Sequence, residues 1–145
     1  MGRIIVSLMA IFLLLLTGCS EKELSYTEIN IKDAKENVKT FIDETEDLNG
    51  THLYYENDQV VYVFVNGINV IQGDEAIYFE DFNLNADEES DALEVSYTQK
   101  KTEDYSNKEL NHQLLYKVVL DKKYETLNAF QNGEAVTFGS VMSSD

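Results

Sequence analysis

The acids between residues 83 and 94 are the first group whose types and spacing could do chemistry. Oxygen-bearing side chains fall at positions 1, 3, 5, 7, 9 and 12 of this window, which are the ligand positions of an EF-hand calcium loop. The sixth position, where that loop requires glycine, holds Glu88, and the flanking segments have strand-like patterns. We therefore interpret the window as a solvated acidic turn, and we retain Asp87, Glu89 and Asp91 as candidates for weak calcium binding.

The chain has few residues that could support histidine-based catalysis. His52 and His112 are the only histidines, and no second cysteine or His-Glu-x-x-His pair completes a zinc set. Ser140, Ser143 and Ser144 lack the Gly-x-Ser-x-Gly turn that exposes a nucleophile. We expect both histidines to be ordinary hydrogen-bonded residues at strand ends. The sequence predicts no catalytic residue, no metal site beyond the calcium candidate, and no cofactor.

Tyrosine is the other residue type with a possible surface role. The chain has nine tyrosines and seven phenylalanines, and we expect most of them in the core. Tyr54 and Tyr55 are adjacent, so in a strand they face opposite ways and one of them is expected to face solvent. Tyr105 lies in a polar segment. Exposed tyrosines supply rigid contact area for proteins or sugars, which makes these three residues candidates for binding.

The first twenty residues have the pattern of an export signal. A basic start is followed by residues 4–16, in which only Ser7 is polar. A helix of that length rises about 20 Å, which is too short for a hydrocarbon core of about 30 Å and typical of a signal peptide. The next motif, Leu16-Thr17-Gly18-Cys19, resembles the lipobox of bacterial lipoproteins. The resemblance implies cleavage between Gly18 and Cys19 and a diacylglycerol on the Cys19 thiol.

The charge of the chain supports a lipid anchor over an electrostatic one. The whole sequence carries 11 basic and 27 acidic side chains, a net charge of −16, and nucleic-acid binding needs clustered Lys and Arg instead. Removal of residues 1–18 would leave ten lysines against 27 acids, a net charge of −17. Anionic lipid headgroups would repel this body, so the acyl chains on Cys19 must hold it. We predict an extracytoplasmic protein that is anchored by lipid to the cell membrane of a Gram-positive bacterium.

The elements that must position these residues begin with one helix. Asp33 can cap it, and Ala34, Val38, Phe41 and Ile42 would share one apolar face. Asn49-Gly50 would end it. The three segments expected along the chain are a signal peptide at 1–18, the lipidated cysteine with a polar tether at 19–30, and a single β-rich domain at 31–145.

From His52 onward the apolar period changes to two, which indicates strands. Residues 60–65 are apolar on both faces and predict a central strand, while Gln131-Asn132-Gly133 predicts a closing hairpin turn. The polar stretches at 86–91 and 100–111 are expected as surface loops. We predict an α+β fold in which the N-terminal amphipathic helix packs on a mainly antiparallel sheet or small sandwich of six to eight strands. The expected strands lie at 52–56, 59–66, 68–71, 76–84, 93–98, 113–120, 127–130 and 135–138.

The succession of elements from Val60 to Phe130 resembles the C-terminal domain of the protease-complex lipoprotein subunit PrcB. The shared pattern is an apolar strand, a glycine turn, a strand, an acidic turn, an alternating strand, a polar excursion and a further apolar strand. The Thr-Gly-Gly-Tyr turn of that family is replaced here by Ile71-Gln-Gly-Asp74, and its prolines are absent. The resemblance implies a small β-rich domain with a protease-associated role.

These features favour a non-enzymatic module that binds another protein at the cell surface. The acidic body would steer a basic partner. The alternative is a binder of a small ligand, a cell-wall sugar or a cation in a cleft lined by tyrosines and carboxylates. A third possibility, an enzyme, would need His52 or His112 beside an acid in such a cleft.

Overall fold

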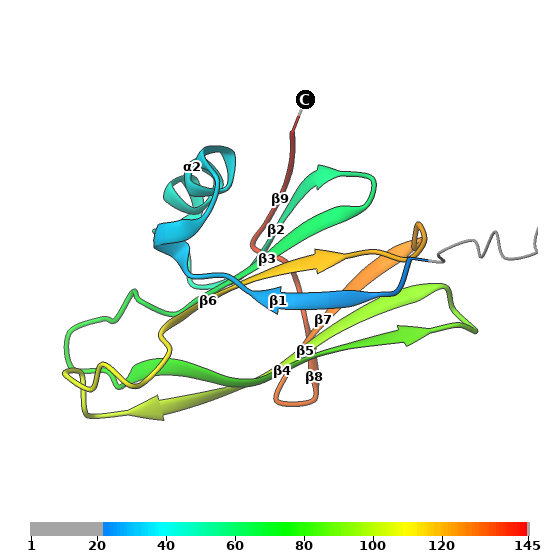
Figure 1. The fold of residues 1–145 in the computed structure, drawn as a ribbon. Coiled ribbons are helices and arrows are strands. Elements are labelled where there is room, and N and C mark those ends of the chain that lie inside the picture. Colours follow the sequence, from blue (N-terminus) through cyan, green and yellow to red (C-terminus); the bar gives the residue numbers. More distant parts are fainter. Residues whose placement is uncertain (1–21, 145) are drawn as a thin grey trace, which may run out of the picture.

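Two β-sheets packed face to face form the body of the protein (Figure 1). The structure is a computed structural model that describes residues 22–144. Sheet A has five strands in the order β1-β6-β3-β2-β9, and sheet B has four in the order β4-β5-β7-β8. The strands are β1 (Ser25–Glu28), β2 (Gly50–Asn57), β3 (Val60–Asn66), β4 (Ala76–Asp87), β5 (Ala92–Thr102), β6 (Gln113–Val119), β7 (Thr126–Gln131), β8 (Glu134–Val136) and β9 (Ser140–Ser143).

The apolar core lies between the two sheets. Alternate residues of β3 and β6 point into it from sheet A, and Phe79, Leu93 and Val95 point into it from sheet B. A buried hydrogen bond also joins the sheets, because the Tyr97 hydroxyl lies 2.7 Å from Thr51 Oγ1. β3 is covered on both faces, as its continuous apolar sequence predicted. The described part of the chain is therefore mostly β, with one α-helix and two sheets.

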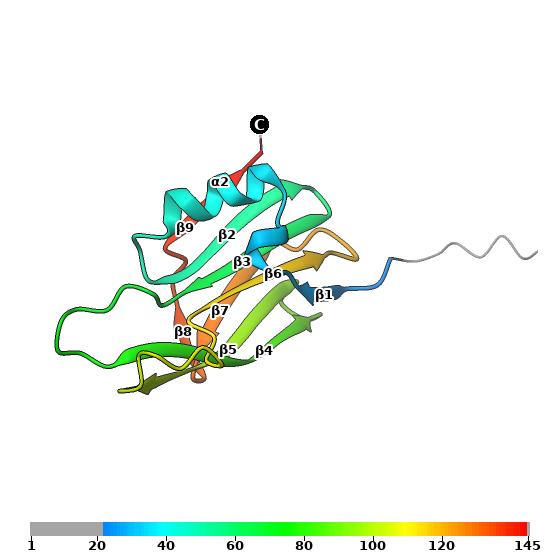
Figure 2. The same ribbon diagram turned by 60° about the vertical axis from the view of Figure 1, so that its left-hand side comes forward.

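The helix α2 (Glu36–Thr45) covers the outer face of sheet A, so the layers are helix, sheet A and sheet B (Figure 2). Val38, Phe41 and Ile42 are buried against Tyr54 and the other residues of this face. The predicted helical stripe is confirmed for Val38, Phe41 and Ile42, whereas Ala34 is buried with them but precedes the helix. The helix ends at Thr45, before the predicted stop at Asn49-Gly50, and the predicted N-terminal cap is also wrong. Asp33 ends a 3-10 turn, η2 (Ile31–Asp33), and Lys35 occupies the N-cap without a side-chain hydrogen bond.

Several predicted boundaries differ from the structure. The polar tether expected at 19–30 contains β1, whose backbone pairs with β6. The helix therefore follows a strand within the described residues. The strand predicted at 68–71 is a loop, and the described strands number nine where six to eight were expected. The hairpin turn between β7 and β8 is confirmed, since Asn132 and Gly133 both have positive φ, as a type I′ turn requires.

β4 is an edge strand with a bulge in its middle. Asp81 has a φ of 54°, and the register with β5 gains one residue between Glu80 and Asn83. Before the bulge Phe79 points into the core, and after it Phe82 does so. The Tyr26 hydroxyl, from β1 of the other sheet, donates to the Phe82 carbonyl at 3.2 Å. The bulge thus turns the second half of β4 toward sheet A.

Candidate functional site

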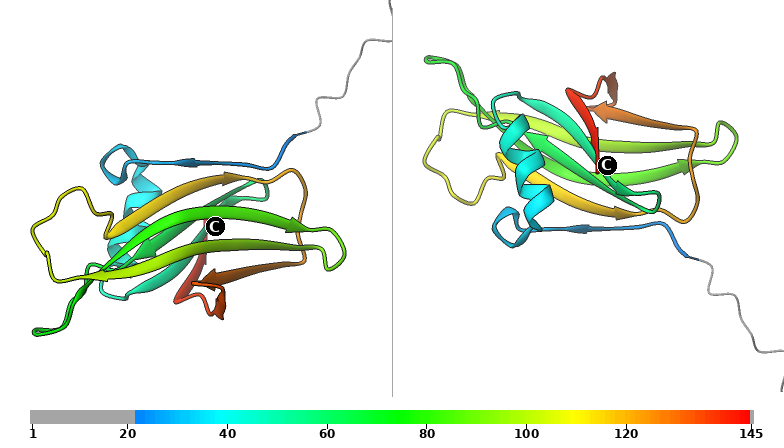
Figure 3. Two further views of the ribbon diagram at one scale, coloured as in Figure 1. Left: turned by 90° about the horizontal axis from the view of Figure 1, so that it is seen from below. Right: turned by 90° about the horizontal axis from the view of Figure 1, so that it is seen from above.

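Three connections meet at one end of the sandwich. They are the α2–β2 connection (46–49), the β3–β4 loop (67–75) and the β5–β6 loop (103–112). Figure 3 shows the latter two loops together at one end in both views, while the described chain begins at the opposite end, beside the β4–β5 turn. Hydrogen bonds link all three connections, so they form one surface.

This surface carries a cluster of exposed apolar side chains. Ile71 is 75% exposed and Tyr105 57% exposed, and Ile68 and Val70 are exposed beside them. We call these four residues the apolar end. Ile68, Val70 and Tyr105 line one pocket, and Val70 and Ile71 line the next, so the four side chains form a continuous surface. Leu48, in the neighbouring α2–β2 connection, is also exposed.

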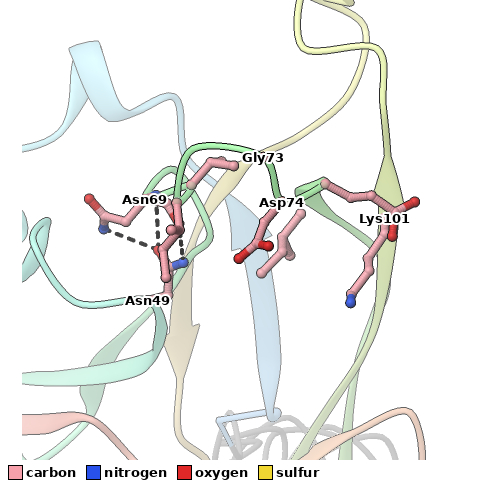
Figure 4. A pocket seen from close by; sticks show the side chains of 9 residues that line it. Asn49, Asn69, Gly73, Asp74 and Lys101 are labelled. Carbon is pink, nitrogen blue, oxygen red and sulfur yellow. Dashed lines mark hydrogen bonds between the residues drawn. The ribbon is translucent and has the colours of Figure 1, made fainter.

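Asparagine side chains hold the loops of the apolar end in place. Asn66, which is 1% exposed, donates from Nδ2 to the carbonyls of Glu46 at 2.8 Å and Leu48 at 2.9 Å. Asn49 Nδ2 donates to the Asn69 carbonyl at 2.7 Å, and the Asn69 amide donates back to Asn49 Oδ1 at 3.0 Å (Figure 4). The exposed apolar residues therefore stand on a rigid support.

The sheet below supports the same loops. A Cβ on Gly67 would lie 2.9 Å from the ring of Phe79, so glycine is needed for the loop to leave β3 across this ring. The Gly67 amide donates to the His112 carbonyl at 2.9 Å, and His112 Nδ1 lies 2.5 Å from the Ile77 carbonyl. The Tyr105 hydroxyl donates to the Asp74 carbonyl. These bonds fasten the β3–β4 and β5–β6 loops to each other and to β4.

Two pockets open at this end. The pocket beside Ile71 has a volume of about 450 Å³, and Figure 4 shows Asn49 and Asn69 on one side of it with Asp74 and Lys101 on the other. The pocket beside Tyr105 is about 230 Å³ and is lined mainly by apolar residues and His112. Tyrosine and carboxylates do not share either pocket. The cleft expected for a sugar or a cation is thus not formed by these loops.

The calcium candidate forms a β-hairpin turn in which the carboxylates of Asp87 and Asp91 already have partners. Asp87 Oδ1 accepts the Glu89 amide at 3.0 Å, and Asp87 Oδ2 accepts the Ser90 hydroxyl at 2.5 Å, which together hold the pKa of Asp87 below its usual value. Asp91 pairs with Lys122 at 2.5 Å. Within residues 22–144, no three acidic, histidine or cysteine side chains converge as a metal site. The predicted long loop is a short turn between β4 and β5.

The two histidines lie on opposite faces of sheet A. His52 is fully buried on the helix side, beside Phe64, whereas His112 bonds to Ile77 of sheet B. His52 Nε2 lies 2.9 Å from the Leu48 carbonyl and donates to it, so Nδ1 accepts the Ser140 hydroxyl at 3.1 Å. This arrangement joins β9 to β2 and to the α2–β2 connection. The histidines do not form a common site.

The stability of the protein should fall as pH drops below about 6.5, because burial lowers the pKa of His52. The unfolded state binds the proton more readily in the window between the lowered pKa and the ordinary one, so the free energy of unfolding falls there. Protonated Nδ1 could no longer accept from Ser140. Urea unfolding at pH values across this window, compared with His52→Asn, measures the effect. An equal slope in both proteins would contradict it, as would an NMR titration midpoint of His52 at or above 6.5.

The three candidate tyrosines have different environments. Tyr54 is buried beneath α2, stacked on Phe41 with its hydroxyl 3.0 Å from Asn37 Nδ2. Tyr55 faces the other way, as predicted, but it is half-buried against the core. Neither has the solvent exposure expected for a contact residue, because both faces of sheet A are covered. Tyr105 alone belongs to the apolar end.

The other three residues of the apolar end were not recognised from the sequence. Ile68, Val70 and Ile71 have the alternating apolar pattern of a strand and were predicted as one. The available signal was the pair of glycines, Gly67 and Gly73, which bracket the segment and indicate a loop.

The lipobox residues Gly18 and Cys19 lie outside the described residues, so lipidation stays a prediction. Among residues 22–144, no helix is long and apolar enough to cross a membrane. Comparison of the chain with models of protein families, with curated proteins and with solved structures gives no match. The similarity to PrcB therefore stays a pattern in the sequence, and the geometry of the apolar end is the basis for the functional proposal.

Proposed function

We propose that this protein is a lipid-anchored, extracytoplasmic lipoprotein that acts as a non-enzymatic protein-binding module, with the apolar end as its contact surface. The observation that carries the proposal is the cluster of four exposed apolar side chains on the β3–β4 and β5–β6 loops, which hydrogen bonds join to each other. Apolar patches fixed at a protein surface are typical of interaction sites. A rigid support also lowers the entropy lost on binding.

The position of the apolar end agrees with attachment through Cys19. The described chain begins at Lys22, at the opposite end of the sandwich from the loops (Figure 3). An anchor attached a few residues before Lys22 would leave the apolar end on the side away from that attachment. The net charge of −17 would also keep the domain off anionic headgroups. A partner in the envelope is then a more suitable target than the bilayer itself.

Site-specific photo-crosslinking in intact cells tests this proposal. Benzoylphenylalanine is placed at position 71 or 105 of the full chain, and at position 88 in the β4–β5 turn as the matched exposed control. We expect a discrete heavier adduct from positions 71 and 105 and none from position 88. The absence of adducts from both loop positions, under all growth conditions tried, would contradict the proposal.

The lipid anchor is tested separately, by fractionation of the same cells. Cys19→Ser should move the protein from the membrane fraction to the soluble fraction, because Cys19 is the only cysteine. An unchanged membrane fraction for this variant would show that the protein is not held by a lipid on that thiol.

A further inference from the structure

We propose that the apolar end recognises a polypeptide segment in which a large apolar side chain is flanked by lysines or arginines. This inference rests on the proposed protein-binding function and names the chemistry of the partner. It follows from the charges that surround the four apolar residues.

The loops of the apolar end are strongly acidic. Seven exposed carboxylates belong to the three connections, whereas the lysines there are Lys108, in the β5–β6 loop, and Lys101, near the end of β5. Two of the carboxylates, Asp74 and Glu75, line the pocket beside Ile71. The seven acids are Glu46, Asp47, Asp74, Glu75, Glu103, Asp104 and Glu109.

These carboxylates are available to a partner. Among residues 22–144 the ion pairs are Lys35–Glu56, Lys100–Glu80 and Lys122–Asp91, and none of them includes an acid of these loops. The Asp74 side chain accepts no hydrogen bond from a described residue either, since the bond from Tyr105 goes to its backbone carbonyl. No described side chain therefore forms an ion pair with these acids, and Lys101 is the one lysine that lines the pocket with Asp74 and Glu75.

An apolar centre with an acidic rim selects its partner by charge. When an apolar side chain of the partner covers Val70 and Ile71, water is removed from the partner side chain and from these two residues. This burial of apolar surface supplies affinity. Its lysine or arginine neighbours would then lie beside Asp74 and Glu75, whereas an acidic segment would meet like charges. Anionic lipid would meet the same repulsion. The surface thus fits a cationic, apolar polypeptide better than a membrane or an acidic protein.

The test uses the full chain, solubilised in a non-ionic detergent and immobilised, with a display library of short random peptides as the probe. Peptides that bind the protein are then passed over the variant Ile71→Ser, and those that bind this variant are removed. We expect the retained peptides to be enriched in lysine or arginine next to a large apolar residue. Enrichment of acidic or uncharged peptides would overturn the inference, and so would the absence of any enrichment.

A synthetic copy of the best-enriched peptide then gives affinities for matched variants. We expect Ile71→Ser to weaken its binding by about tenfold, with Val141→Ser as the exposed apolar control. Asp74→Asn combined with Glu75→Gln should weaken it by about threefold at low salt and by less at high salt. The control for charge is Glu88→Gln combined with Glu89→Gln, at the opposite end of the sandwich, which should leave binding unchanged.

The two proposals fail in different ways. If crosslinks form from positions 71 and 105 but the charge variants and salt leave affinity unchanged, the partner class is wrong and the protein-binding function stands. If no crosslink forms and Ile71→Ser has no effect, both are wrong. Binding of the protein to phosphatidylglycerol vesicles that depends on Ile71 would overturn the inference in favour of a membrane surface.

Discussion

Phe79→Ala is expected to lower the free energy of unfolding by about 3–5 kcal/mol. Phe79 is 2% exposed, and its ring packs edge-on against Tyr97 at 5.6 Å between centroids. The same ring lies directly beneath Gly67, where the β3–β4 loop leaves sheet A. Alanine would leave a cavity between the sheets and remove the floor of this loop. Urea unfolding followed by tyrosine fluorescence measures the loss.

The control for Phe79→Ala is Ile71→Ala in the same region. Ile71 is exposed, so its truncation should change the free energy of unfolding by no more than about 0.5 kcal/mol. Phe79→Ala tests how the core supports the apolar end, whereas Ile71→Ala removes a contact side chain and leaves that support intact. A loss below about 1 kcal/mol for Phe79→Ala would mean that the two sheets do not pack around this ring.

Asn66→Asp is expected to cost about 3–5 kcal/mol at neutral pH, although it hardly changes the shape of the side chain. The Nδ2 group of Asn66 faces the carbonyls of Glu46 and Leu48, and replacing it by an ionised oxygen would put like partial charges together in a buried site. Protonation of the new carboxyl would restore one donor, so part of the stability should return at acidic pH. Urea unfolding at neutral and acidic pH measures both effects.

Asn69→Asp is the matched control for this change. Asn69 Nδ2 also donates to the Glu46 carbonyl, at 2.7 Å, but this side chain is exposed to water. Its loss should be about 1 kcal/mol. Equal losses for the two variants would show that Asn66 is not the buried support of these loops. Weaker peptide binding by Asn66→Asp, in the fraction that stays folded, would further show that loop rigidity contributes to recognition.

The parts of the fold that the sequence predicts correctly depend on local patterns. The apolar run 60–65 is typical of a strand covered on both faces, and Asn132-Gly133 favours the positive φ values that it has in the β7–β8 turn. The pairing of β9 beside β2 and of β7 beside β5 could not be predicted, because both are parallel contacts between distant segments. No pattern within a single segment specifies such a neighbour.

The candidate site was the harder part, for a related reason. Residues 68–71 have the composition of a strand, and only the absence of a covering element makes them a surface. Tyr54 and Tyr55 were correctly predicted to face opposite ways, but the sequence does not say that α2 covers one face of sheet A and sheet B the other. Whether a side chain is exposed depends on which layers pack over it, and a single segment does not contain that information. Tyr105 was identified because its polar neighbours indicated a loop.

The bulged edge of β4 affects how the protein behaves when many copies are crowded together. A long, straight edge strand offers unpaired backbone groups on which a second molecule can add a strand, and this is how sheets polymerise into aggregates. In β4 the Phe79 amide is already bonded to Asn111, the Phe82 carbonyl accepts from Tyr26, and Asp81 breaks the regular spacing between them. No uninterrupted row of free donors and acceptors runs along this edge between Ile77 and Phe82. This edge is thus a poor template for a strand from a second copy of the protein, even where many copies are held at high local concentration.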